Sequence, residues 1–160
     1  MIHRTIRVCC WKGEILTNRN RIPIKYYGVG EHIKVECKIY SVDNRYFRIF
    51  DFVIDTGATI SGISESVAVQ LGYDPSAPYS LEDFDTAAGI EEKLPIIELS
   101  RIDVHHLNLE KPKVLCNKNF DAINIHGVFG LDFLTHYNLY INFDENFMQI
   151  NERKIKVITP

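Results

Sequence analysis

One short segment constrains this chain more than any other. The apolar residues FVI at positions 52–54 are followed directly by Asp55, Thr56 and Gly57. The apolar run predicts a strand covered on both faces, and a carboxylate at the end of such a strand is costly to bury unless hydrogen bonds or a functional role compensate it. Gly57 lets the backbone turn back tightly enough to offer N–H groups to that carboxylate. Asp55 is therefore a candidate functional residue.

The composition predicts a mainly β fold around this segment. The chain has 160 residues, 46% of them apolar and 24% charged, which suits one folded globular domain. Ile and Val together number 32, against 17 for Leu and Ala, and β-branched residues favour strands. We therefore expect an all-β fold with one or two short helices.

Charge and hydropathy exclude several kinds of partner. The formal net charge is −3 and no dense basic run is present, so nucleic acid is not an expected partner. No apolar stretch approaches the roughly 18 residues that a membrane helix needs, and the charged N-terminal segment does not resemble a signal peptide. We expect no membrane partner and a cytoplasmic location.

The cysteines and histidines do not predict a metal site. Cys9, Cys10, Cys37 and Cys116 lack C-x-x-C spacing and are expected to be free thiols. The adjacent pair at 105–106 (HH) is better explained by a surface turn than by metal binding, because neighbouring side chains on a strand point to opposite faces. His126 could sense pH, although a loop histidine with ordinary hydrogen bonds is the better interpretation. We expect no metal and no cofactor.

Turn and helix signals divide the chain into short elements. Residues 1–31 form a β-rich extension, which we expect to belong to the same domain as residues 32–160. Ser64 and Gly72 mark the start and stop of a short helix at 65–71. The other expected elements are a hairpin (32–40 and 46–54), an extended hairpin (81–99, turning at 87–89), strands near 102–104 and 114–116, a helix at 131–137, and a last hairpin (139–143 and 147–150).

A second signal lies 75 residues after the first. The segment Val128-Phe129-Gly130 again places apolar residues before a glycine, and a short helix is expected after it. Together the two segments resemble the retropepsin-like aspartic proteases. In that family a strand ends in Asp-Thr-Gly-Ala, a flap hairpin follows, and an apolar-apolar-Gly segment completes a ψ-shaped loop beside the aspartate. The resemblance covers about Ile33 to Ile150.

The resemblance implies an acid-protease-like closed barrel with one lobe per chain. Family members hydrolyse polypeptides with two carboxylates that share one proton. This chain has one Asp-Thr-Gly; the segment DTA at 85–87 lacks the glycine and follows a polar stretch. The second acid is therefore expected to be Asp55 of another copy, at the twofold axis of a homodimer.

The same resemblance assigns roles to individual residues. Thr56 is expected to lock the two loops across the dimer axis, and Gly57 to offer backbone hydrogen bonds to the aspartate and the substrate. Ala58 lacks the hydroxyl found in pepsin-like relatives, so we expect activity at weakly acidic to near-neutral pH. The expected substrate-binding residues are Gly57, Ala58, Thr59, Val128 and the flap residues Ala88, Gly89 and Ile90.

Two positions depart from the retroviral members of the family. Thr59 replaces the usual Asp or Ser, and Leu131 replaces the usual Arg, so both partners of a possible ion pair are lost together. This joint loss indicates a cellular or bacterial-type branch. Asp132, in the first turn of the expected helix, is interpreted as a helix cap.

These observations predict an aspartic endopeptidase in which paired Asp55 carboxylates activate water. The alternative is a non-catalytic peptide-binding or dimerisation module that keeps the fold, since a fold alone does not guarantee chemistry. The intact Asp55-Thr56-Gly57 favours catalysis, because a scaffold has no need of a buried acid. An unrelated β-barrel that binds a ligand is a third interpretation.

Overall fold

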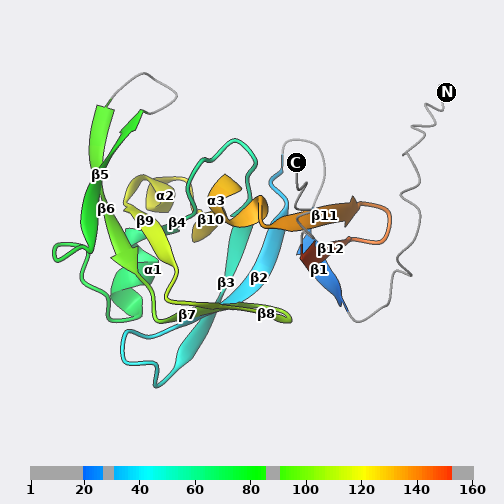
Figure 1. Cartoon of the computed structure of the whole chain (residues 1–160), viewed down its shortest axis with the longest axis horizontal. Helices are drawn as coiled ribbons and strands as arrows, with labels where there is room; N and C mark the ends of the chain where they lie inside the picture. Colours follow the sequence, from blue (N-terminus) through cyan, green and yellow to red (C-terminus); the bar gives the residue numbers. More distant parts are fainter. Residues whose placement is uncertain (1–19, 27–30, 86–90, 153–160) are drawn as a thin grey trace, which may run out of the picture.

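The computed structural model describes residues 20–26, 31–85 and 91–152. It is built mainly of strands, with three short helices among the described residues (Figure 1). The strands are β1 (Arg21–Lys25), β2 (Lys34–Tyr40), β3 (Phe47–Ile54), β4 (Gly62–Ser64), β5 (Ser80–Asp85), β6 (Glu91–Glu98), β7 (Arg101–Val104), β8 (Leu107–Glu110), β9 (Lys113–Asn117), β10 (Gly127–Phe129), β11 (Tyr137–Asn142) and β12 (Phe147–Glu152), and the helices are α1 (Glu65–Gln70), α2 (Asn119–Ala122) and α3 (Leu131–Leu134). The expected mainly β fold is confirmed.

The hairpin of β2 and β3 forms the centre of the molecule. It pairs antiparallel along its whole length, from Lys34 opposite Val53 to Tyr40 opposite Phe47. Along β2 every second residue is buried, whereas β3 becomes continuously apolar towards its end. Phe52 is fully buried and packs on Phe129, with ring centroids 5.0 Å apart. The strand that ends at Asp55 thus enters the core, as its apolar run predicts.

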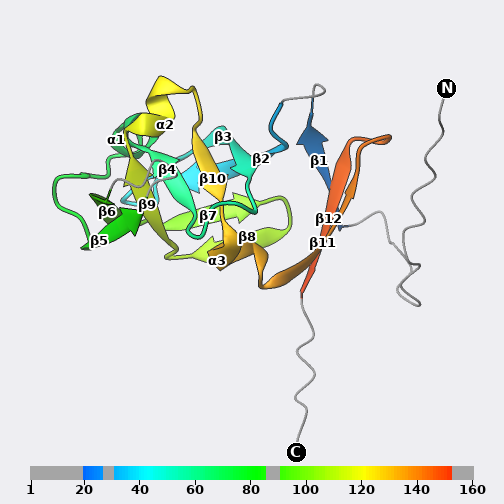
Figure 2. The same cartoon turned by 90° about the horizontal axis from the view of Figure 1, so that it is seen from above.

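The sheet is open, and this corrects the expectation of a closed barrel. Its strand order is β11-β12-β1-β2-β3-β10-β4-β9-β6-β5, with the β7–β8 hairpin attached to β2. The hairpins β5–β6 and β11–β12 lie at opposite ends of the molecule in both views (Figures 1 and 2). Because no pairing joins β5 to β11 in the described residues, the two ends of the sheet remain separate edges.

Two elements near residues 101–142 differ from the expectation. Residues 101–110 form a complete hairpin, in which β7 and β8 pair from Arg101 opposite Glu110 to Val104 opposite Leu107. The expected helix at 131–137 ends at Leu134, because Tyr137 already pairs with Glu152 as the first residue of β11. Strand pairing therefore overrides helix propensity at this end.

Other expectations from turn chemistry are confirmed. Ser64 caps α1 by accepting a hydrogen bond from the Val67 N–H at 3.2 Å, and Gly72 ends it with a φ of +85°. Residues 105–106 form an exposed turn between β7 and β8. Cys37 and Cys116 are free and buried, and Cys9 and Cys10 lie outside the described residues. No helix in the described part of the chain is long and apolar enough to cross a membrane.

Candidate functional site

The site is built where β10 is inserted between β3 and β4. Strand β10 pairs parallel with β3 and antiparallel with β4, and residues 55–61 connect these two outer strands around its end. The N–H of Asp55 donates to the carbonyl of Phe129 at 3.1 Å, and the N–H of Leu131 donates to the carbonyl of Ala58 at 2.8 Å. The two segments singled out from the sequence therefore meet as one ψ-shaped loop.

Asp55 lies half-buried at the open end of this loop. The Gly57 N–H donates to its Oδ1 at 2.8 Å, as the turn at Gly57 predicts. A Cβ at position 57 would lie 3.1 Å from the same oxygen, so glycine suits this close approach. No other described residue donates a hydrogen bond to the carboxylate. One carboxylate oxygen is thus held in place, and the other is available to a reactant.

Three residues that follow Asp55 in the loop are exposed. Thr56, Gly57 and Thr59 are exposed, and Ala58 is half-buried. The backbone carbonyl of Thr59 accepts a hydrogen bond from the Asp132 N–H at 3.1 Å. The side chains of Thr56 and Thr59 therefore remain accessible while the backbone of the loop is fixed by the segment that follows β10.

Gly130 is required by the close approach of the two segments. A Cβ at this position would lie 2.7 Å from the carbonyl carbon of Ile60 and 2.9 Å from the carbonyl oxygen of Ala58. Both neighbours are backbone atoms, which cannot swing aside as a side chain can. Any larger residue at position 130 would push the Asp55 loop away from β10.

Ser61 and Asp132 form a tie across the loop that the sequence interpretation missed. Asp132 Oδ1 accepts hydrogen bonds from the Ser61 N–H at 2.9 Å and from the Ser61 hydroxyl at 2.6 Å. It also accepts from the Phe133 N–H at 2.8 Å, while Gly130 N–H donates to the Ser61 hydroxyl at 3.0 Å. The expectation that Asp132 caps α3 is wrong, because the N-cap position belongs to Gly130 and no side chain caps this helix. Asp132 lies in the first turn of α3 and instead connects the two halves of the ψ-shaped loop.

The expected extended hairpin at 81–99 is formed by β5 and β6, and its role as a flap stays a prediction. Its strands pair from Ser80 opposite Ile96 to Asp85 opposite Glu91. The expected flap residues Ala88, Gly89 and Ile90 lie outside the described residues, and so do positions 86 and 87 of the DTA segment. Val128 is buried in the centre of β10, at 6% exposure, between β3 and β4. Its expected role in substrate binding stays a prediction.

The other titratable candidates do not join this site. His126 packs its ring on Phe50 with centroids 5.3 Å apart, on the approach to β10. Burial raises the pKa of the Cys37 thiol well above its ordinary value, and it raises the pKa of Cys116 to about 12. Both described thiols are therefore protonated and unreactive near neutral pH. The described residues contain no cluster of three or more metal-ligating side chains.

Comparisons with known proteins agree with this arrangement. No curated protein matches the chain. Among solved structures, a retropepsin-like aspartic protease from Rickettsia conorii is similar, with 17% identity and a TM-score of 0.59 over 82% of this chain and 89% of that one. The retroviral protease-like domain of Ddi1 from Leishmania major has 17% identity and a TM-score of 0.48 over 75% and 88% of the two chains.

A match to a family model identifies the protein family of the chain. The model described as gag-polyprotein putative aspartyl protease matches residues 43–136, which is more than half of the 160 residues. The matched region includes the Asp55 loop, the β5–β6 hairpin and Gly130. The chain therefore belongs to this aspartyl protease family, and its fold is retropepsin-like.

Proposed function

We propose that the chain is an aspartic endopeptidase that acts as a homodimer, with one Asp55 from each subunit at the twofold axis. The observation that carries this proposal is the state of Asp55. Its carboxylate is fixed by Gly57 through one oxygen, and no described residue occupies the other. A carboxylate in this state, at the open end of a tightly held loop, is ready to exchange a proton with water.

The chemistry of the proposed pair follows from its shared charge. Two carboxylates about 3 Å apart cannot both ionise readily, so the pair holds one proton. The ionised member takes a proton from water, whose oxygen adds to the carbonyl carbon of the peptide bond. The protonated member donates its proton to the carbonyl oxygen. The carboxyl that took the water proton then donates it to the amide nitrogen and the C–N bond breaks, while a hydroxyl of the collapsing diol returns a proton to the other carboxylate.

The neighbouring residues support this mechanism by their positions. The exposed Thr56 lies next to Asp55, where a contact across the twofold axis would fix the two loops relative to each other. Gly57, Ala58 and Thr59 offer backbone and small side chains to an extended polypeptide substrate. In this proposal Ala88, Gly89 and Ile90 close over the substrate, and Val128 supports the floor of its pocket.

The direct test of catalysis compares Asp55→Asn with the wild type on a diverse peptide library. Asn keeps an oxygen that can accept from Gly57, but it cannot serve as the base or share the proton. Asp85→Asn is the matched control, because Asp85 opens the DTA segment that resembles the motif. We expect cleavage to be lost in the first variant and kept in the second. Equal cleavage by Asp55→Asn and wild type would exclude the mechanism and favour a non-catalytic peptide-binding module.

The shared site is tested separately by mixing subunits. If each active site needs Asp55 from both chains, equal amounts of wild type and Asp55→Asn leave about one quarter of randomly paired dimers intact. The rate per wild-type chain then falls to about half of its value without the variant. Sedimentation of the same samples gives the mass. A monomer that cleaves at full rate would exclude the homodimer mechanism.

A further inference from the structure

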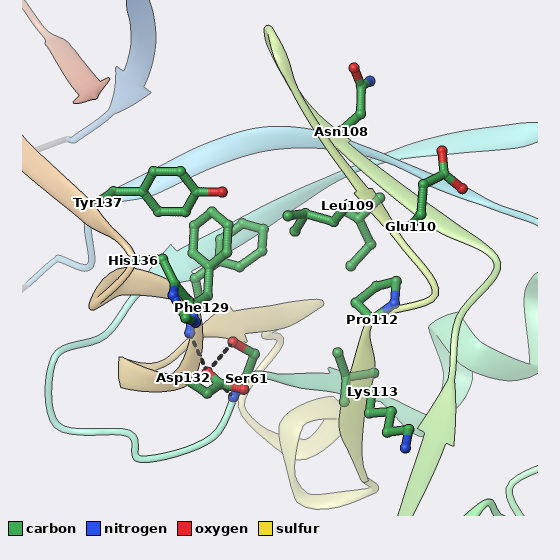
Figure 3. Close-up of a pocket in the computed structure, with 13 residues that line it drawn as sticks. Ser61, Asn108, Leu109, Glu110, Pro112, Lys113, Phe129, Asp132, His136 and Tyr137 are labelled. Carbon is green, nitrogen blue, oxygen red and sulfur yellow. Dashed lines mark hydrogen bonds between the residues drawn. The ribbon is translucent and has the colours of Figure 1, made fainter. Parts of the chain in front are cut away.

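A cavity borders the ψ-shaped loop. Its volume is about 340 Å³, and residues from the β8–β9 segment and from α3 and the start of β11 line it. Figure 3 shows Leu109 and Pro112 on one side and Phe129, His136 and Tyr137 on the other. Asp55 does not line this cavity, whereas Ser61, Phe129 and Asp132 of the ψ-shaped loop do.

The walls of the cavity are mainly aromatic and aliphatic. Phe133 packs on Phe129 with ring centroids 4.5 Å apart and on Tyr137 with centroids 5.0 Å apart. Leu109 and Pro112 lie across the cavity from Phe129 and Tyr137 (Figure 3). Such walls suit an apolar body, and aromatic faces also attract an organic cation.

Two of the charged side chains that line the cavity are directed elsewhere. Glu110 Oε1 lies 3.8 Å from Arg101 Nε, and Lys113 Nζ lies over the ring of Tyr79, 3.7 Å from its centroid. Figure 3 shows the polar ends of both Glu110 and Lys113 pointing away from the cavity. Neither charge therefore compensates a charged ligand inside it.

Asp132, His136 and Tyr137 are the remaining titratable residues that line the cavity. The three hydrogen bonds to Asp132 all go to Oδ1, and no described residue donates to Oδ2. The side chain is thus rigidly placed, with one acceptor oxygen left over. His136 is exposed, on the same side of the cavity. An ammonium group could donate a charge-assisted hydrogen bond to this second oxygen, Oδ2.

We propose that this cavity binds small organic cations in which an ammonium group is attached to a compact aromatic body. The ammonium group donates hydrogen bonds to Asp132 Oδ2, and the aromatic body packs between Phe133 and Leu109. The volume suits a ligand of this size, since small-molecule sites range upward from about 300 Å³. The inference is independent of the proposed protease activity.

Binding is tested by titrating the full chain with 2-phenylethylamine while following its backbone amide resonances by NMR. We expect shifts confined to residues 107–114 and 129–137, with a Kd of about 0.1–1 mM. The uncharged 2-phenylethanol and the anionic 3-phenylpropionate should bind at least about tenfold more weakly, because they do not supply the cation. N-acetyl-lysine amide, which has the ammonium group without the aromatic body, should also bind at least about tenfold more weakly.

Three variants test whether 2-phenylethylamine binds in this cavity. Asp132→Asn keeps an Oδ1 acceptor for Ser61 but removes the charge, and should weaken 2-phenylethylamine binding at least about tenfold. Glu110→Gln removes the neighbouring carboxylate and should leave the affinity unchanged. Leu109→Trp should block the cavity without touching the Ser61–Asp132 tie, so it tests the binding site even if Asp132→Asn fails to fold. No shifts with wild type, equal affinity for the alcohol, or unchanged binding to Leu109→Trp would each overturn the proposal.

Discussion

Asp55 and Asp103 carry the same functional group, but their surroundings differ in every respect that matters for chemistry. Asp103 is 9% exposed on β7. Its Oδ1 accepts from Arg101 Nε at 2.6 Å and Asn108 Nδ2 at 2.7 Å, and its Oδ2 accepts from Arg101 Nη2 and the Tyr40 hydroxyl, both at 2.9 Å. Asp55, in contrast, is half-buried and has one described donor, the Gly57 N–H.

The two carboxylates differ in whether their oxygens are already occupied by hydrogen-bond donors. Both oxygens of Asp103 are occupied by donors, so a proton or a substrate could bind there only by displacing them. The carboxylate of Asp55 is positioned but largely unoccupied, and the backbone around it is fixed by the neighbouring strand instead. Hydrogen bonds between backbone groups thus fix the Asp55 loop, and the carboxylate itself remains accessible.

The largest expected effect comes from exchanging the two acids for their amides. Asp55→Asn should reduce kcat/KM by about a thousandfold or more, with little change in melting temperature, because the amide oxygen still accepts from Gly57. Asp103→Asn should leave kcat/KM nearly unchanged and lower the melting temperature. Peptide cleavage and thermal unfolding of both variants measure this. A stable Asp103→Asn variant that has lost activity would contradict the purely stabilising role of Asp103.

Removing the Asp103 side chain should give the largest loss of stability. Asp103→Ala leaves Arg101, Asn108 and Tyr40 without their shared acceptor, and we expect the free energy of unfolding to fall by about 2–3 kcal/mol. Asp51→Ala is the matched control, since Asp51 forms a partly exposed ion pair with Lys25 at 2.6 Å. Its loss should cost less than about 1 kcal/mol. Urea unfolding measures both, and equal losses would contradict the special role of the Asp103 network.

The sequence singled out Asp55 better than it singled out Asp103. Asp55 stands out locally, because an apolar strand precedes it and a glycine follows two residues later. The apolar-apolar-Gly pattern at Gly130 is also visible locally, although the backbone atoms that a Cβ there would meet belong to the distant Ile60 and Ala58. The pattern around Asp103 is ordinary, since its partner Tyr40 is 63 residues away and is brought near by the pairing of β2 with β7.

The features that the sequence did not predict depend on distant pairing. The Ser61–Asp132 tie joins side chains 71 residues apart, and either residue alone resembles a simple cap. The surface turn at residues 105–106 was predicted, but strand β8 after it was not, because its pairing with β7 follows a turn residue, His105, whose φ of +54° no Gly or Asn marks in the sequence. Whether the sheet closes depends on whether its two end strands, β5 and β11, pair with each other, so no single segment of the sequence could predict it.

Ser61→Ala extends the comparison to a third acid, Asp132. The variant removes the hydroxyl that donates to Asp132 and accepts from the Gly130 N–H, and should lower the free energy of unfolding by about 1–2 kcal/mol. The control is Ser66→Ala, whose exposed hydroxyl donates to Asp121 and should matter by less than about 0.5 kcal/mol. Because the tie positions the Asp55 loop, we also expect kcat to fall with KM little changed. Unchanged kcat would show that Asp55 is positioned without the tie.

The smallest expected effect is a difference in acid stability. Burial acts to raise the pKa of Asp103, but hydrogen bonds from Arg101, Asn108 and Tyr40 outweigh it and lower the pKa below its ordinary 3.8. Since the folded-state pKa is the lower one, this carboxylate stabilises the fold above pH 3.8, and that contribution is lost as pH falls through the folded-state pKa. The free energy of unfolding of wild type should therefore decline more steeply below pH 4 than that of Asp103→Asn. Parallel curves, measured by urea unfolding between about pH 2 and 5, would show that the network does not favour the charged carboxylate, and the contrast with Asp55 would then rest on access alone.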